Sequence, residues 1–107
     1  MKLSELIHFL NEIAPPHFQE SYDNSGHLVG NPNDDIRSVL TSLDVTEEVV
    51  DEAISLDANV ILSHHPIIFS GLKRLTGQNY VQRIVQKAIK NDINLFAIHT
   101  NLDNVYY

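Results

Sequence analysis

The sequence predicts an α/β protein in which helices cover a largely parallel sheet, and two observations lead to this prediction. Short apolar runs, which are typical of buried strands, alternate along the chain with segments whose apolar residues recur at helical spacing. Of the 107 residues, 43% are hydrophobic and 20% are charged, which is the balance of one folded domain. Strands that alternate with amphipathic helices predict βαβ units joined by right-handed crossovers.

The first part of the chain predicts a helix and a short extended segment. Apolar residues recur at helical spacing over residues 3–10, and the prolines at 15–16 end this helix. Turn-forming residues at 22–26 and 30–34 then enclose a short extended segment at 27–29.

The rest of the chain predicts three strands separated by two helices. We expect the strands at residues 36–43, 59–63 and 94–98, and the helices at 46–56 and 81–90. Residues 66–77 have two glycines and no clean periodicity, so they predict a long loop directly after the second of these strands. Long loops inside compact domains tend to be functional.

Polar side chains follow each of the three strands. Asp44 follows the first, His64 and His65 follow the second, and His99 and Asp103 follow the third. In parallel α/β sheets the ligand site lies at the carboxyl ends of the strands. The pattern therefore predicts that these residues meet at one edge of one sheet.

These residue types point to a metal site. Histidine is the commonest protein metal ligand, and adjacent residues of an extended chain point to opposite sides. We therefore expect His64 and His65 to hold different ions of a pair, with Asp103 as a carboxylate ligand. Such a mixed site suits zinc, iron, manganese or nickel. His99 could be a further ligand or could orient one. Alternatively, the histidines form ordinary hydrogen bonds at a strand end, and Asp44 caps the helix that follows it.

Charge and composition narrow the range of partners. The net charge of −7 argues against nucleic-acid binding, and no apolar stretch approaches the roughly 20 residues of a membrane span. The chain has no cysteine, so we expect no disulfides and a cytoplasmic protein. Residues 58–107 carry five basic against two acidic side chains, which would suit an anionic small molecule. Lys73 and Arg74 could approach a phosphate tail; alternatively they form a solvated basic loop.

Several motifs together resemble one known family. They are Tyr22-Asp23-Asn24-Ser25-Gly26, Ser63-His64-His65-Pro66 and His99-Thr100-Asn101-Leu102-Asp103. In order and spacing they resemble the Nif-three-like family, the Ngg-one-interacting-factor-three homologues, often labelled GTP cyclohydrolase 1 type 2 homologues. The resemblance implies a duplicated three-layer α/β/α fold with a mixed, mainly parallel sheet. Residues 1–107 match its N-terminal repeat, and the C-terminal repeat is absent from this chain.

The resemblance also implies a site and an assembly. Family members bind two divalent ions between the repeats, and His64, His65 and Asp103 match the ligands of the first repeat. The remaining ligands come from a C-terminal motif, while Asn24, Asp44 and His99 would lie nearby. Family members assemble into ring-like homohexamers whose metal sites face an internal cavity.

Two functions follow as hypotheses. The first is a metal-dependent hydrolase of a nucleotide or related anionic small molecule, such as a GTP cyclohydrolase, with His99 as a proton shuttle. The second is a non-catalytic metal-binding scaffold or protein-interaction ring. Because half of the implied site is missing, we expect this chain alone to be inactive.

Overall fold

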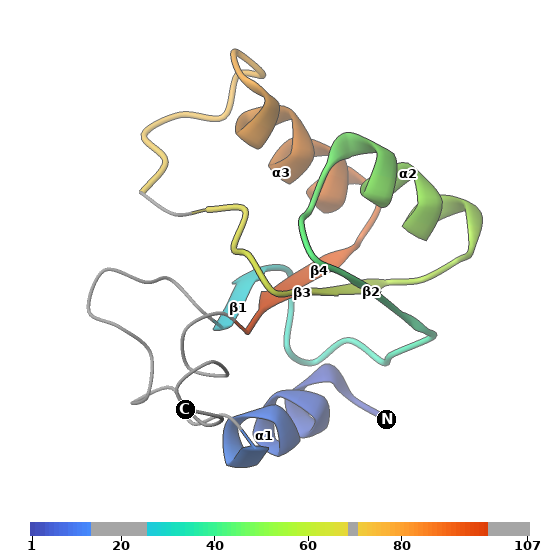
Figure 1. The fold of residues 1–107 in the computed structure, drawn as a ribbon. Helices are drawn as coiled ribbons and strands as arrows, with labels where there is room; N and C mark the ends of the chain where they lie inside the picture. Colours follow the sequence, from blue (N-terminus) through green and yellow to red (C-terminus); the bar gives the residue numbers. More distant parts are fainter. Residues whose placement is uncertain (14–25, 69–70, 99–107) are drawn as a thin grey trace.

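The computed structural model describes residues 1–13, 26–68 and 71–98, which form a sheet between helices (Figure 1). Helix α1 lies on one face of the sheet, and helices α2 and α3 lie on the other (Figure 1). The predicted three-layer arrangement is therefore confirmed. The elements are α1 (Leu3–Ile13), β1 (Gly26–Val29), β2 (Val39–Ser42), α2 (Glu47–Ser55), β3 (Val60–Ser63), α3 (Tyr80–Lys90) and β4 (Asn94–Ala97).

The sheet is mixed and mainly parallel, as predicted. Its strand order is β1-β4-β3-β2, in which β2, β3 and β4 are parallel and β1 pairs with β4 in the antiparallel direction. Ser42 is opposite Ser63, and Ser63 is opposite Ala97. The three parallel strands therefore end in step, and the residues that follow them leave the sheet at the same edge.

The strand predicted at 36–43 is shorter in the structure, because only Val39–Ser42 pairs with β3. The backbone before it is bonded elsewhere: the Ile36 amide donates to the Met1 carbonyl, and the Arg37 amide donates to Asn59 Oδ1. The first bond ties the segment to the N-terminus, and the second ties it to a side chain directly before β3, so neither continues the strand ladder. A β-propensity pattern does not reveal which partner a backbone group takes.

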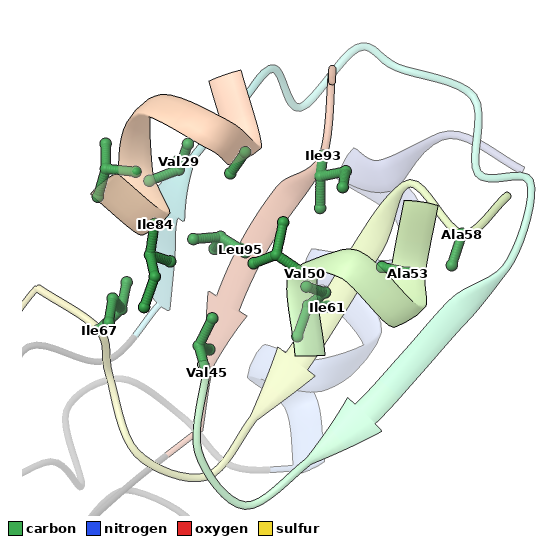
Figure 2. Close-up of a cluster of buried hydrophobic side chains, with 12 residues drawn as sticks. Val29, Val45, Val50, Ala53, Ala58, Ile61, Ile67, Ile84, Ile93 and Leu95 are labelled. Carbon is green, nitrogen blue, oxygen red and sulfur yellow. The ribbon is translucent and has the colours of Figure 1, made fainter. Parts of the chain in front are cut away.

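Two hydrophobic clusters hold the layers together. The larger one fills the space between the sheet and helices α2 and α3 (Figure 2), where Val50, Ile61, Ile84 and Leu95 are almost completely buried. The smaller one lies under α1, where Ile7, Leu10 and Leu62 pack against Phe96 and Ile98. The neighbouring β4 residues Leu95 and Phe96 thus pack on opposite faces of the sheet, as side-chain alternation along a strand requires.

Helix α2 is capped at its first turn, and ion pairs link it to α3. Thr46 caps α2, since its Oγ1 accepts a hydrogen bond from the Val49 amide at 3.1 Å. The idea that Asp44 caps this helix is therefore wrong.

Two ion pairs, Arg83–Glu47 and Lys87–Asp51, link α3 to α2. Arg83 and Lys87 are two of the five basic residues of residues 58–107. Because both are paired with carboxylates, less positive charge is available to an anionic ligand than the sequence indicates.

A buried amide organises the amino ends of the strands. Asn94 is fully buried; its Oδ1 accepts from the Asn31 amide at 2.7 Å and lies 3.1 Å from His27 Nε2. Its Nδ2 donates to Asp34 Oδ2 at 3.1 Å. Gly30 lies so close that a Cβ there would be 1.8 Å from Asn94 Oδ1. Both polar atoms of the Asn94 side chain therefore have partners, as a buried amide requires.

None of the helices in the part of the chain that the structure describes is long and apolar enough to cross a membrane.

Candidate metal centre

The histidine pair is held in place by the neighbouring strand. The His64 amide donates to the Ser42 carbonyl at 3.3 Å, and the His65 amide donates to the Leu43 carbonyl at 3.0 Å. On the other side, the Ile98 amide donates to the Ser63 carbonyl at 2.9 Å. The backbone pairing of the sheet thus continues past the assigned ends of the strands. As a result, both histidines have fixed backbone positions at the carboxyl edge.

Two serines shape the turns that leave this edge. Ser63 Oγ donates to the His65 carbonyl at 2.9 Å, and Ser42 Oγ donates to the Asp44 carbonyl at 2.8 Å. In each case the serine is the last residue of its strand and bonds two residues ahead. Local bonds of this kind favour a turn over a continued strand. The two turns bring Asp44 and His65 side by side.

Asp44 and His65 form a direct contact, with 2.5 Å between Asp44 Oδ1 and His65 Nδ1. Because an ionised carboxylate only accepts hydrogen bonds, Nδ1 of the imidazole is the protonated nitrogen in this contact. In a neutral imidazole the lone pair is then on Nε2. A carboxylate that fixes the tautomer and the ring orientation in this way is the usual partner of a metal-binding histidine.

His64 and His65 line different hollows, although both follow the end of β3 and neither is part of a regular strand. His65 lines a hollow of about 250 Å³ together with Asp44, Val45, Thr46, Pro66, Ile67 and Tyr80. His64 lines one of about 150 Å³ with Thr41, Ser42, Leu62, Ser63 and Ile98. The two ring centroids are nevertheless only 5.1 Å apart, with 51° between the ring planes. This geometry suits one ion on each histidine, since paired catalytic ions lie about 3.5–4 Å apart.

Several predicted site residues are not placed by the structure. Asn24, His99 and Asp103 lie outside the described residues, so their predicted roles stay predictions. Among residues 1–13, 26–68 and 71–98, no three histidine or carboxylate side chains come close enough together to hold an ion. Of the predicted residues, the structure brings together Asp44, His64 and His65.

The predicted anion contacts are not among the residues that line either hollow. Lys73 and Arg74 are exposed on the segment between β3 and α3, and the described linings of the His64 and His65 hollows do not include them. Their contact with a phosphate tail therefore stays a prediction.

Sequence reasoning missed Tyr80, which lines the His65 hollow and is 60% exposed. A signal for it exists in the sequence. Asn79 has the residue type of an N-cap, and in a βαβ unit the helix after a strand begins near the carboxyl edge of the sheet. The first residue of α3 could therefore have been placed beside the histidines.

The fold and the edge residues define a three-layer α/β protein with a histidine pair where its parallel strands end. A family model identifies it further: the Duf34/NIF3 (NGG1p interacting factor 3) model matches residues 1–107. The chain belongs to this family, which confirms the resemblance inferred from its motifs.

Similar proteins support the assignment and are much longer. The chain is 52% identical to a GTP cyclohydrolase 1 type 2 homolog of Staphylococcus epidermidis, with 96% of the chain and 28% of that protein covered. It is 42% identical to a protein of the same name from Clostridium perfringens, with 98% and 40% covered. The crystal structure of Staphylococcus aureus protein SA1388 matches with 47% identity and a TM-score of 0.92, over 96% of this chain and 29% of that one. The chain thus spans less than half the length of these relatives.

Proposed function

We propose that the carboxyl edge of the sheet binds divalent metal ions and forms part of a metal-dependent hydrolase site. The single observation that supports this most strongly is the Asp44–His65 contact with the His64 ring 5.1 Å away. His65 combines a carboxylate partner at 2.5 Å with a side chain that is 45% exposed. A metal ligand benefits from both, because the carboxylate orients the ring and exposure admits the ion.

The donor set indicates which ions fit. His64 and His65 supply imidazole nitrogens, and Asp103 supplies the proposed carboxylate. Two ions of zinc, iron, manganese or nickel suit such a mixed set, with water or additional protein groups completing their coordination. When bound, these ions supply Lewis acidity to a hydrolytic reaction. The chain's own residues orient the ligands, and His99 moves a proton to or from the reacting group.

The proposed substrate is a nucleotide or a related anionic small molecule. Relatives carry the name GTP cyclohydrolase 1 type 2 homolog, which denotes a resemblance to enzymes acting on GTP. In this chain Lys73 and Arg74, exposed after the histidines, are the proposed contacts for a phosphate tail. We propose that the protein acts in the cytoplasm on small molecules and not on nucleic acid, which its net charge of −7 disfavours.

A second candidate is an assembly role, as a metal-binding scaffold or protein-interaction ring. It is favoured by exposed apolar side chains: Phe9 on α1, Leu43 after β2 and Leu56 after α2 are each more than half exposed. Apolar side chains at such positions are suited to packing against another repeat or another copy. A homohexameric ring would cover them without requiring any catalysis.

Two measurements test the proposal. The first is calorimetric titration of the chain with Zn²⁺ and Mn²⁺, comparing the wild type with His64→Ala, His65→Ala and the double variant. We expect at least about tenfold weaker binding for each single variant and no measurable site in the double variant. His8→Ala is the matched control, because His8 is an exposed histidine paired with Glu12 on α1. Unchanged affinity in the double variant would overturn the metal proposal.

The second measurement separates the two functions. A full-length relative, such as the Staphylococcus aureus protein, is loaded with zinc, iron or manganese and offered GTP. Metal-dependent loss of GTP, abolished when the two corresponding histidines are replaced, supports the hydrolase. Absence of turnover in the metal-loaded protein overturns the cyclohydrolase version and leaves the scaffold.

A further inference from the structure

We propose that the hollow beside His65 binds the ring of the substrate, and that this ring is an aromatic heterocycle of the guanine type stacked on Tyr80. The inference rests on the proposed function and deepens it, because it names the part of the chain that recognises the substrate. It uses three observations: the size of the hollow, the exposure of Tyr80 and the chemistry of Asp44.

The size of the hollow suits one ring system. Its volume of about 250 Å³ is slightly below the roughly 300–1,000 Å³ of pockets that bury a whole drug-sized ligand. A purine ring would fill it, and the rest of a nucleotide would extend outside. Val45, Pro66 and Ile67 supply apolar walls, while Asp44, Thr46 and His65 supply polar atoms. Apolar walls combined with a few convergent polar groups are usual in small-molecule sites.

Tyr80 is an exposed ring on a rigid support. It is 60% exposed, although it begins a helix whose other face is buried at Ile84. The loop before it is fixed by Gln82, a buried residue whose Oε1 accepts from the Gln78 amide at 3.0 Å and lies 3.3 Å from the Thr76 amide nitrogen. An aromatic side chain on a backbone fixed in this way offers a stacking surface.

The Asp44 carboxylate is the reason for proposing a guanine-type ring as the ligand. Its carboxylate accepts a hydrogen bond from His65 Nδ1 and still has acceptor capacity, because a carboxylate offers about four lone-pair positions. Guanine presents an N1–H and an exocyclic amino group on one edge, and both donate to a carboxylate. Adenine presents the N1 lone pair at the same place, which a carboxylate repels. A ring bound through this edge lies against His65, beside the proposed ion.

The test uses guanosine, which has the ring but no phosphate. It is titrated into the Zn²⁺-loaded chain while the amide and aromatic resonances are followed by NMR. We expect shifts of the Tyr80 ring and of the Val45 and Thr46 amides, and weaker shifts with adenosine. Tyr80→Ala should weaken guanosine binding at least about tenfold, the order expected for losing one base–aromatic stack. Tyr80→Phe should bind within about twofold of the wild type, because the ring is retained.

The matched control is Phe9→Ala, which removes another exposed aromatic ring from α1, on the opposite face of the sheet (Figure 1). It should leave guanosine affinity unchanged. Equal guanosine affinity in Tyr80→Ala and the wild type would overturn the inference, as would equal binding of adenosine and guanosine.

The same samples distinguish this failure from failure of the proposed function. If Zn²⁺ binding requires His64 and His65 but guanosine binding is indifferent to Tyr80, the ring site is wrong and the metal proposal stands. If guanosine requires Tyr80 but Zn²⁺ binds equally without the histidines, the metal proposal is wrong and the ring site stands as a nucleoside pocket.

Discussion

The two ends of the same sheet use polar side chains in opposite ways. At the amino ends of β3 and β4, Asn59 and Asn94 are buried and bind the chain's own backbone in four hydrogen bonds. At the carboxyl edge, the side chains of Asp44 and His65 are 58% and 45% exposed and bind each other. At the first end the two buried side chains are amides, which do not change charge. At the second, open end the polar side chains are half-exposed, and we propose that they bind metal ions.

This difference separates stability from function within one small sheet. Removing a buried hydrogen-bonding group leaves its partners unsatisfied and lowers the free energy of unfolding. Removing a half-exposed group at the open end leaves little unsatisfied, because water replaces the lost partner. We therefore expect substitutions at the amino ends to change stability, and substitutions at the carboxyl edge to change metal affinity.

The largest effect is expected for Asn94→Ala. It removes the acceptor of the Asn31 amide and the donor to Asp34, and it leaves a cavity in the sheet. The free energy of unfolding should fall by about 3–4 kcal/mol, because several buried groups lose their partners together. Urea denaturation followed by circular dichroism measures it. A loss below about 1 kcal/mol would contradict the importance of this end for stability.

Gly30→Ala should have the next largest effect. Its Cβ would meet Asn94 Oδ1 at 1.8 Å, and its backbone has a φ of +119°. We expect a loss of about 2–3 kcal/mol from strain and overpacking in the same urea experiment. Gly26→Ala is the matched control, because Gly26 has the same φ but nothing within 4 Å of its Cβ position. If the two variants were equally destabilised, the contact with Asn94 would not be the cause.

At the other end, Asp44→Ala should weaken Zn²⁺ binding by about 10- to 100-fold, because His65 loses the carboxylate that orients it. The free energy of unfolding should change by less than about 1 kcal/mol, since both side chains are partly exposed. Calorimetry gives the affinity, and urea denaturation gives the stability. Asp51→Ala removes a carboxylate paired with Lys87 instead, and it should leave Zn²⁺ affinity unchanged.

Ser63→Ala should have the smallest effect, and it affects both properties. The lost bond from Ser63 Oγ to the His65 carbonyl should lower stability by about 1 kcal/mol. Zn²⁺ affinity should fall only a few-fold, because the backbone bond from His65 to Leu43 remains. An affinity loss as large as that of Asp44→Ala would show that the turn, and not the carboxylate, positions the histidine.

One side of this comparison, the carboxyl edge, could be predicted in part from the sequence. The alternation of apolar strands and amphipathic helices predicted the parallel strands, and their ends predicted that Asp44, His64 and His65 would lie at one edge. The contact between Asp44 and His65 could not be predicted, because it depends on the register of β2 and β3 and on two serine-bonded turns. The role of Asn94 as a buried hydrogen-bonding amide could not be predicted either, because a polar residue at the start of a strand resembles an ordinary loop boundary.

The central claim is that His65 binds a metal ion through Nε2 while Asp44 holds Nδ1. The most direct test is NMR of the histidine ring nitrogens in the ¹⁵N-labelled chain, with and without Zn²⁺. We predict that Zn²⁺ shifts the Nε2 resonance of His65 to that of a metal-bound nitrogen, leaves Nδ1 protonated, and loses this effect in Asp44→Ala at the same Zn²⁺ concentration. Ring nitrogens of His64 and His65 that do not respond to saturating Zn²⁺ would contradict the claim.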